Sequence, residues 1–355
     1  MRYFEKIDGL RFVAIFFVLI EHFAPLIGHK ISAGYYGVDL FFVISGFLIT
    51  NILLVSKGNV FTSYKNFVGR RTLRIFPIYY ITIFAFILVG YEPARDYLLY
   101  LATYTFNYAW LYFDIPDTAL NHFWSLAVEE QFYLFWPFLV LPFRKKTKAL
   151  FYVIIIITAL CFVQLTFRVI ESVNMYNYVG IFPRAGSLTM GALGGLLFNK
   201  KLLSDSFFSS KLIELFVISL LVVSLLVYYP GKEFVLALTS LYLVLKATHS
   251  NFSFPYLNRL LSSPKAIFIG KISYGIYIFH HPISYFLTTL YILPWWGTVN
   301  FELLGKYSFI ENYLWLFLFP FFVILSIIMA YFSNKYIEKP ILSFKDVLFA
   351  HKKEV

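Results

Sequence analysis

Two side chains that can carry charge lie in the first long apolar stretch of the sequence: Arg11 and His22, eleven residues apart. On a helix, eleven steps of about 100° make three turns plus only about 20°, so both side chains point the same way, about 16 Å apart along the axis. Ionisable groups in an apolar span usually face the protein interior or an aqueous path. His22 is therefore the first candidate catalytic residue.

Asp39 is a candidate orienting group for His22. It lies near the start of the second apolar stretch, a short loop away from the end of the first, which predicts a similar depth for the two side chains. A carboxylate beside an imidazole raises its basicity and fixes its tautomer, as in a catalytic dyad. The alternative is a buried histidine that joins two helices by a hydrogen bond.

A third group of polar residues lies in the run NHFWSLAVEEQFYLFWP, which begins just before His122. Glu129 and Glu130 are both candidate catalytic carboxylates, and one of them is a further candidate to orient His22. They point about 100° apart on a helix, so at most one can face the same neighbours as His122 or His22. Glu130 lies about one turn from Tyr133 and can pair with it. Trp124 is a candidate substrate contact, although an aromatic belt at the membrane interface explains it equally well.

Three residues farther along the chain are candidate substrate contacts. Arg184 lies in FPRAGSLTMGALGG, whose small residues favour close helix packing and whose arginine can bind an anion or a carboxylate. Tyr277 and His280 lie in KISYGIYIFHHP. The histidine pair in this run is compatible with a proton relay and equally with packing at a helix end.

Arg70, Arg71 and Arg74 belong to a basic loop before the third apolar stretch. Topology alone accounts for this loop, and contact with phospholipid is also possible. Yet Arg71 and Arg74, three residues apart at the start of an amphipathic helix, can share one face and grip phosphates. All three arginines are candidate donor-binding residues, together with Arg11.

The composition sets these residues in a membrane. Of 355 residues, 60% are apolar and 14% charged, and a soluble domain with that balance has too little polar surface to face water. The net charge of +11 comes from short basic loops and indicates topology, not nucleic-acid binding. The single cysteine, Cys161, excludes an intramolecular disulfide and a cysteine metal cluster, and no metal site is expected.

The apolar stretches predict an all-α bundle of about ten transmembrane spans. Basic loops place both termini in the cytoplasm. The segment 97–113 begins and ends outside, so it is expected to be a re-entrant or interfacial segment next to a cavity. We expect a membrane domain over residues 8–340 and a basic cytoplasmic tail over residues 341–355. The expected spans are residues 10–26, 38–55, 75–90, 123–143, 149–167, 179–198, 212–229, 234–245, 272–293 and 313–332.

The ordered set of motifs resembles the bacterial membrane acyltransferase 3 family. The matching segments are DGLRFVAIFFVLIEHF, GVDLFFVISGFLIT, RRTLRIFPIYY, FWSLAVEEQFYLFWP, KISYGIYIFHHP and YIEKP. The resemblance implies transfer of an acyl group, usually acetyl, from cytoplasmic acyl-coenzyme A to a hydroxyl of an extracytoplasmic carbohydrate. It implies a catalytic role for His22, paired in its motif with Arg11, and donor binding by Arg71 and Arg74. It also implies a place in the bacterial cytoplasmic membrane.

Two other classes of function fit the same features. An exporter of polysaccharide or lipid-linked sugar can use buried charges as substrate or proton sites, and a structural subunit of a glycan-synthesis assembly needs no catalytic histidine. Some members of the family carry a further hydrolase-like domain that the sequence does not show. Acceptor handling is therefore expected in the membrane part or in glycan-synthesis partner proteins.

Overall fold

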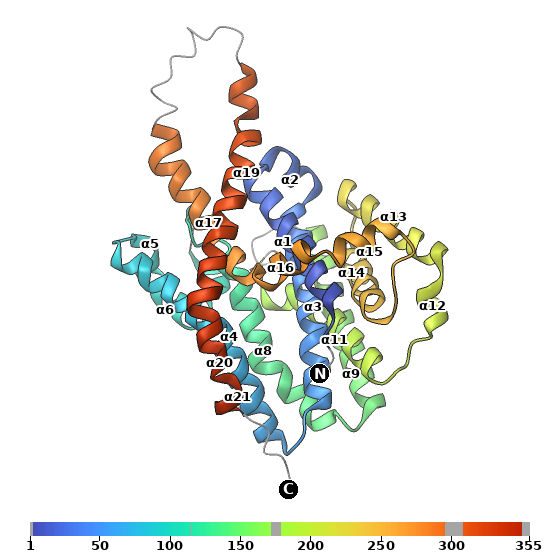
Figure 1. Ribbon diagram of the computed structural model, residues 1–355. Helices are drawn as coiled ribbons and strands as arrows, with labels where there is room; N and C mark the ends of the chain where they lie inside the picture. The colour runs from blue at the N-terminus through green and yellow to red at the C-terminus, as the bar shows by residue number, and fades with distance from the viewer. Residues whose placement is uncertain (1–2, 114, 172–178, 295–307, 350–355) are drawn as a thin grey trace.

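The described part of the chain is built from helices alone. The computed structural model describes residues 3–113, 115–171, 179–294 and 308–349, and the regular elements within these ranges are all helical (Figure 1). Five stretches, in α3, α4, α9, α11 and from α19 through α20, are long and apolar enough to cross a membrane. The all-α class is confirmed for the described residues, and the chain is a multi-pass membrane protein.

Each of the ten expected spans overlaps one long helix, while the number of membrane crossings stays a prediction. These helices are α1 (Glu5–Phe23), α3 (Ala33–Val55), α4 (Val60–Leu88), α8 (Phe123–Phe143), α9 (Thr147–Glu171), α11 (Ile181–Asn199), α13 (Lys211–Leu226), α14 (Lys232–His249), α17 (Ser273–Leu287) and α19 (Ser308–Ser333).

Short helices join or extend the long ones. They are α2 (Pro25–Ile31), α5 (Glu92–Asp96), α6 (Leu98–Ala102), α7 (Phe106–Tyr112), α12 (Asp205–Ser209), α15 (Pro255–Leu261), α16 (Pro264–Lys271), η1 (Thr288–Ile292), η2 (Asn334–Glu338), α20 (Lys339–Ser343) and α21 (Lys345–Leu348).

The basic segment before the third apolar stretch is helical and not a loop. Asn59 caps α4, because its side chain accepts a hydrogen bond from the backbone N–H of Thr62 at 2.7 Å. This satisfies one of the free N–H groups of the first turn and favours a helix start there. Arg70, Arg71 and Arg74 therefore lie inside α4, where the helix fixes the direction of each.

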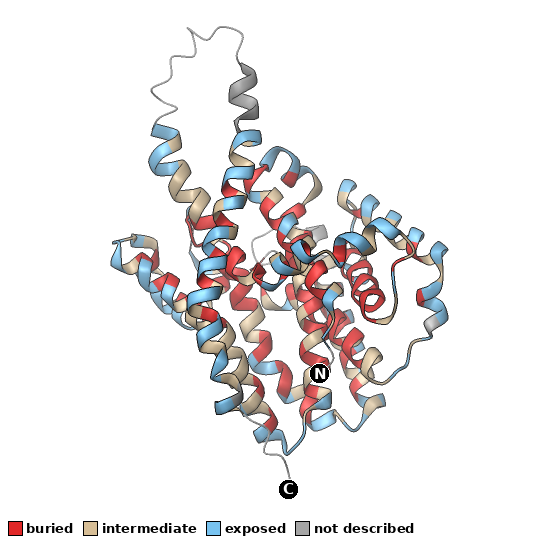
Figure 2. Cartoon of the chain, viewed as in Figure 1, coloured by how far each residue is buried: buried red, intermediate tan, exposed pale blue. Residues whose placement is uncertain are grey.

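Close packing of α3 against α11 forms the centre of the bundle. A side chain added at Gly46 of α3 would meet the backbone of Leu188, and one added at Gly191 of α11 would meet the carbonyl of Val43. Buried residues are concentrated in this pair and in α14 (Figure 2). The close helix contact expected from the small residues around Arg184 is confirmed.

The segment 97–113 is not a single helix. It consists of α6 and α7, five and seven residues long, and Tyr104 between them has a positive φ of 52°. Helices this short cannot cross roughly 30 Å of hydrocarbon. The expectation that this segment is no simple crossing is confirmed, and a cavity lined by residues 102–104 lies beside it, as expected.

Side chains satisfy the irregular backbone of this segment. The hydroxyls of Tyr79 and Tyr80 donate to the carbonyls of Leu101 and Ala102 at 2.9 and 2.8 Å. Gln131 of α8 donates to the carbonyl of Tyr104 at 2.7 Å. Irregular backbone within a membrane protein survives where protein groups replace water in this way.

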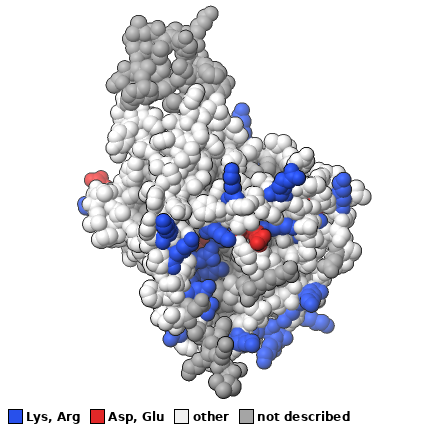
Figure 3. Space-filling view, viewed as in Figure 1, with Lys and Arg blue, Asp and Glu red and all other residues white. Residues whose placement is uncertain are grey.

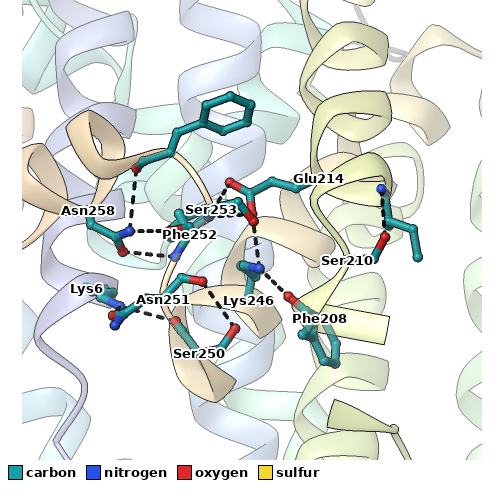
Figure 4. Close-up of polar contacts among 12 residues, drawn as sticks. Lys6, Phe208, Ser210, Glu214, Lys246, Ser250, Asn251, Phe252, Ser253 and Asn258 are labelled. Atoms are coloured by element: carbon teal, nitrogen blue, oxygen red, sulfur yellow. Dashed lines mark hydrogen bonds and ion pairs between the residues drawn. The ribbon is translucent and has the colours of Figure 1, made fainter. Parts of the chain in front are cut away.

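A buried ion pair joins α13 to α14 (Figure 4). Lys246 Nζ lies 3.0 Å from Glu214 Oε2, and the two side chains are 1% and 0% exposed. The carboxylate also accepts from the backbone N–H of Ser253, and Lys246 donates to the carbonyl of Phe208. Lys246 thus holds α13 and α14 together.

The outer surface suits a lipid environment. Large apolar side chains such as Phe84, Phe135 and Phe317 are 59%, 63% and 69% exposed, on the outward faces of α4, α8 and α19. Lys and Arg side chains gather over the middle and lower part of the face in Figure 3, with few acidic side chains among them. Exposed apolar area of this extent indicates contact with lipid.

Candidate active site

Three arginines from two helices line a narrow cavity of about 70 Å³, which we call the arginine cavity. They are Arg11 of α1 and Arg71 and Arg74 of α4. Arg11 forms an ion pair with Asp8 at 3.7 Å. In the described part of the chain, Arg71 and Arg74 pair with no carboxylate. Guanidinium groups without acidic partners are suited to binding phosphate groups.

Arg70 faces away from this cavity. Its guanidinium donates to the carbonyl of Phe349 at 2.6 Å, so it attaches the end of the described chain to α4, with α21 beside the lower part of α4 (Figure 1). Neighbouring residues of a helix point about 100° apart, which explains why Arg70 and Arg71 have different surroundings. The structure thus separates Arg70 from the other three candidate donor-binding residues.

Glu129 also lines the arginine cavity. Its carboxylate accepts hydrogen bonds from the hydroxyls of Ser45 and Tyr133. Glu130, three residues before Tyr133, was a candidate partner for it, but Tyr133 pairs with Glu129, four residues before it; both spacings allow contact on a helix.

Glu130 lines a third cavity, of about 230 Å³, together with Tyr104 and Gln131. Arg71 and Tyr133 border both this cavity and the arginine cavity. Of the two adjacent carboxylates, neither lines the cavity that contains His22, so the structure places both away from the imidazole that one of them was expected to orient.

His22 lines a larger cavity of about 1010 Å³, which we call the histidine cavity. Its side chain is exposed, and Trp124 and Tyr277 form part of the same wall. Trp124 and Tyr277 were both expected to contact substrate, and both are in a position to do so. A substrate in this cavity has direct access to the imidazole.

The arginine and histidine cavities meet at Val38 and Tyr277, which line both. The Tyr277 hydroxyl lies 2.5 Å from Ser125 Oγ and 3.3 Å from the carbonyl of His122. Arg11 and His22 therefore face two adjoining cavities from one side of α1, as their spacing predicts. The side chains of Val38 and Tyr277 stand between the arginine cavity and the histidine cavity.

Four imidazoles from three parts of the chain form a cluster at the wall of the histidine cavity. The ring centroid of His22 lies 5.0 Å from that of His280 and 4.9 Å from that of His281. His122, just before α8, lies 5.0 and 5.3 Å from the same two rings. We call these four residues the imidazole cluster.

His280 and His281 have different surroundings although they are adjacent. His281 lines the histidine cavity, whereas His280 is 0% exposed and lies behind it. The 100° turn between neighbours on α17 directs one ring into the cavity and the other into the protein. His280 was expected to contact substrate, but His281 is the member of the pair that lines the histidine cavity.

Asp39 pairs with Arg184 and not with His22. Arg184 Nη1 lies 3.4 Å from Asp39 Oδ1, and each side chain is 1% exposed. The guanidinium also lies over the rings of Tyr35 and Trp124, at 3.9 and 4.9 Å. Asp39 faces α11, while its neighbour Val38 faces the cavities. Asp39 was expected to orient His22, and Arg184 was expected to bind a substrate anion. In the structure each side chain instead neutralises the charge of the other.

Among the described residues, no group of three or more His, Cys, Asp or Glu side chains is arranged to hold a metal ion. The imidazole cluster therefore brings rings together without forming a ligand set. Cys161 is a buried free thiol.

Comparison with known proteins identifies the family. The sequence model of an acyltransferase domain matches residues 4–333, a range that includes every residue of the arginine and histidine cavities. The chain belongs to the acyltransferase 3 family. No solved structure shows significant similarity to it.

Two relatives in this family come from Gram-positive bacteria. The chain is 30% identical to YrhL of Bacillus subtilis, named as a candidate peptidoglycan O-acetyltransferase, over 99% of this chain and 57% of YrhL. It is 26% identical to the O-acetyltransferase OatA of Staphylococcus aureus, over 99% of this chain and 60% of OatA. The chain thus spans less than two thirds of the length of either relative.

Several residues of this acyltransferase 3 site give little signal in the sequence. Ser45 and Ser273 line the arginine cavity, and Asp117 and Asn121 line the histidine cavity. Serine is common in membrane helices, so its presence predicts no site. Asp117 lies in a link between helices, where a polar residue is expected.

Glu21, which stands directly before His22, has a structural explanation. Its carboxylate accepts from the backbone N–H of Gly34 at 3.0 Å and lies 3.6 Å from His29 Nε2. These contacts join α1, α2 and the start of α3. The charge therefore fixes the chain next to the candidate base.

Proposed function

We propose that this acyltransferase 3 protein is a membrane O-acyltransferase that moves an acyl group, usually acetyl, from coenzyme A to a hydroxyl outside the membrane. The observation that carries the proposal is the junction of the arginine and histidine cavities at Tyr277. It puts a site suited to an anionic donor next to a histidine that an acceptor can reach, and in this proposal the pantetheine arm passes between them beside Tyr277.

The donor in this proposal binds with its phosphates at Arg71 and Arg74 and its pantetheine arm along Arg11. Neither Arg71 nor Arg74 has an ion-pair partner within 4.0 Å among the described residues. The extended arm is about 15 to 20 Å long, similar to the distance of about 16 Å along α1 from Arg11 to His22. This match brings the thioester to the imidazole.

His22 acts as the general base in the transfer. It takes the proton from the acceptor hydroxyl while the oxygen attacks the thioester carbonyl carbon. The resulting tetrahedral intermediate collapses, the carbon–sulfur bond breaks, and the sulfur of coenzyme A takes the proton back from His22. The products are an ester and the free thiol, and no proton is gained or lost overall.

The acceptor in this proposal is a carbohydrate of the cell envelope. The names of YrhL and OatA point to O-acetylation, and that of YrhL to peptidoglycan. The histidine cavity, at about 1010 Å³, has room for a sugar beside Trp124, whose ring is suited to packing on a sugar face. Partner proteins of glycan synthesis can present the acceptor.

We place the chain in the bacterial cytoplasmic membrane with ten crossings and both termini in the cytoplasm. The links from α3 to α4 and from α8 to α9 lie at the same, lower end of the bundle (Figure 1). Both links adjoin basic residues, such as Lys57 and Arg144, as the positive-inside rule requires of cytoplasmic loops.

The test is acyl transfer by the purified full chain in proteoliposomes, with labelled acetyl-coenzyme A inside and a peptidoglycan fragment outside. We expect labelled acceptor from the wild type, none from His22→Ala, and retained coenzyme A binding in that variant. His249→Ala is the matched control, because His249 packs on Phe208 and lines neither cavity. Full transfer by His22→Ala would refute the role of His22.

Coenzyme A binding separates this proposal from export of polysaccharide or lipid-linked sugar. An exporter has no need of the thioester, so failure of the wild type to bind acetyl-coenzyme A would favour the exporter. A structural subunit would bind no donor and would tolerate loss of His22.

A further inference from the structure

Three ring nitrogens of the imidazole cluster are buried without a hydrogen-bond partner among the described residues, one each on His122, His280 and His281. His280 Nδ1 lies 2.7 Å from the carbonyl of Tyr277. A carbonyl can only accept, so Nδ1 carries the hydrogen and Nε2 of the neutral ring carries a lone pair. Nε2 is buried and has no partner among the described residues.

His122 is held in the same way as His280, except that Nε2 and Nδ1 exchange roles. Its Nε2 lies 3.2 Å from the carbonyl of Ile278, so Nε2 carries the hydrogen and the buried Nδ1 is an acceptor without a partner in the described chain. Backbone carbonyls of α17 therefore fix the tautomers of two rings at once. Buried acceptors are normally satisfied, and an exception calls for an explanation.

The carboxylates that could orient His22 are bound elsewhere. Asp39 is paired with Arg184, and Glu129 is hydrogen-bonded to Ser45 and Tyr133. Two rings pack against His22, and of these His280 has its tautomer fixed by the carbonyl of Tyr277 and lies behind the histidine cavity, with centroids 5.0 Å apart. Two imidazoles joined by an N–H···N bond of about 2.9 Å have centroids about 5 Å apart, so a rotation of the His22 ring completes such a bond.

We propose that His280 is the positioning residue for His22. It takes the role that an aspartate or glutamate carboxylate has in other catalytic dyads. Its Nε2 accepts the N–H of His22, which leaves the second nitrogen of His22 as a base directed into the histidine cavity. When His22 takes a proton, both of its nitrogens become donors, and His280 Nε2 receives one of them. His122 supports His280 through their ring contact at 5.0 Å. This inference rests on the proposed function of His22.

Two substitutions at one position test the proposal. His280→Asn keeps a donor for the carbonyl of Tyr277 and removes the Nε2 acceptor. His280→Gln places an amide oxygen near the position of Nε2. In the full chain we expect His280→Asn to lower kcat about 10- to 100-fold with the KM for acetyl-coenzyme A within about twofold of wild type. His280→Gln should recover at least part of the lost kcat.

The kinetic results have clear contrary outcomes. A wild-type kcat in His280→Asn, or a raised KM with unchanged kcat, would overturn the positioning role. Equal losses in the Asn and Gln variants would do so too, since a residue needed only for packing gains nothing from the amide oxygen.

Nitrogen-15 NMR of the histidine side chains gives a readout independent of acyl transfer. We expect a single tautomer for His22 in the wild type and in His280→Gln, and a mixture in His280→Asn. His281→Asn is the comparison variant: His281 lies equally near His22, with centroids 4.9 Å apart, but its ring lines the histidine cavity. Its loss should leave the tautomer of His22 unchanged. A mixture of His22 tautomers in the wild type would overturn the positioning role of His280, even if acyl transfer is observed. If His22 has a single tautomer that depends on His280 but no acyl transfer occurs, only the proposed function is refuted.

Discussion

Asp39 and Arg184 lie on different helices, α3 and α11, and their side chains meet at 3.4 Å with 1% exposure each. Removing one partner of a buried ion pair leaves an uncompensated charge, at a cost of about 3–5 kcal/mol. We therefore expect Asp39→Ala to lower the melting temperature of the protein in detergent. Tryptophan fluorescence during heating measures this temperature. The double variant Asp39→Ala, Arg184→Met should recover part of the loss, and a double variant less stable than the single one would contradict charge neutralisation.

The second prediction separates two adjacent arginines. Arg71→Ala should raise the KM for acetyl-coenzyme A about 10- to 100-fold, since a hydrogen bond to a charged group contributes about 1.5–3 kcal/mol. Arg74→Ala should act in the same direction. Arg70→Ala is the control, because the Arg70 guanidinium is hydrogen-bonded to the carbonyl of Phe349. The KM of this variant for acetyl-coenzyme A should stay near that of wild type. Steady-state kinetics at fixed acceptor concentration measure these constants.

Tyr277 at the junction of the cavities offers a third prediction. Tyr277→Trp enlarges the side chain and should lower kcat/KM at least about tenfold, because a misplaced thioester loses its approach to His22. Tyr277→Phe keeps the ring size and should lose less. Direct binding of coenzyme A, measured by calorimetry, should persist in both variants; unchanged turnover in the Trp variant would mean that the acyl group follows another path.

The fourth prediction concerns stability away from the site. Lys246→Met leaves the buried Glu214 without its cation, which should destabilise the protein by about 3–5 kcal/mol. The double variant Lys246→Met, Glu214→Gln should be more stable than Lys246→Met alone. Acyl transfer at low temperature should be retained in both, because neither residue lines the arginine or histidine cavity.

The sequence alone was sufficient for properties that depend on local periodicity and composition. Apolar runs predicted a helical membrane protein, and the eleven-residue spacing predicted that Arg11 and His22 share one side of α1. The small residues around Gly191 predicted a close helix contact. These predictions succeed because helix geometry and the transfer of side chains to lipid depend on residue type and nearby spacing.

Only the tertiary structure decided which side chains meet. Asp39 faces Arg184 while Val38 faces the cavities. Glu129 and Glu130 line different cavities, and His281 lines the histidine cavity while His280 lies behind it. Each choice is between neighbours that point about 100° apart. The rotation of one helix against another, set by packing between segments far apart in sequence, determines which neighbour reaches the site, and local spacing carries no information about that rotation.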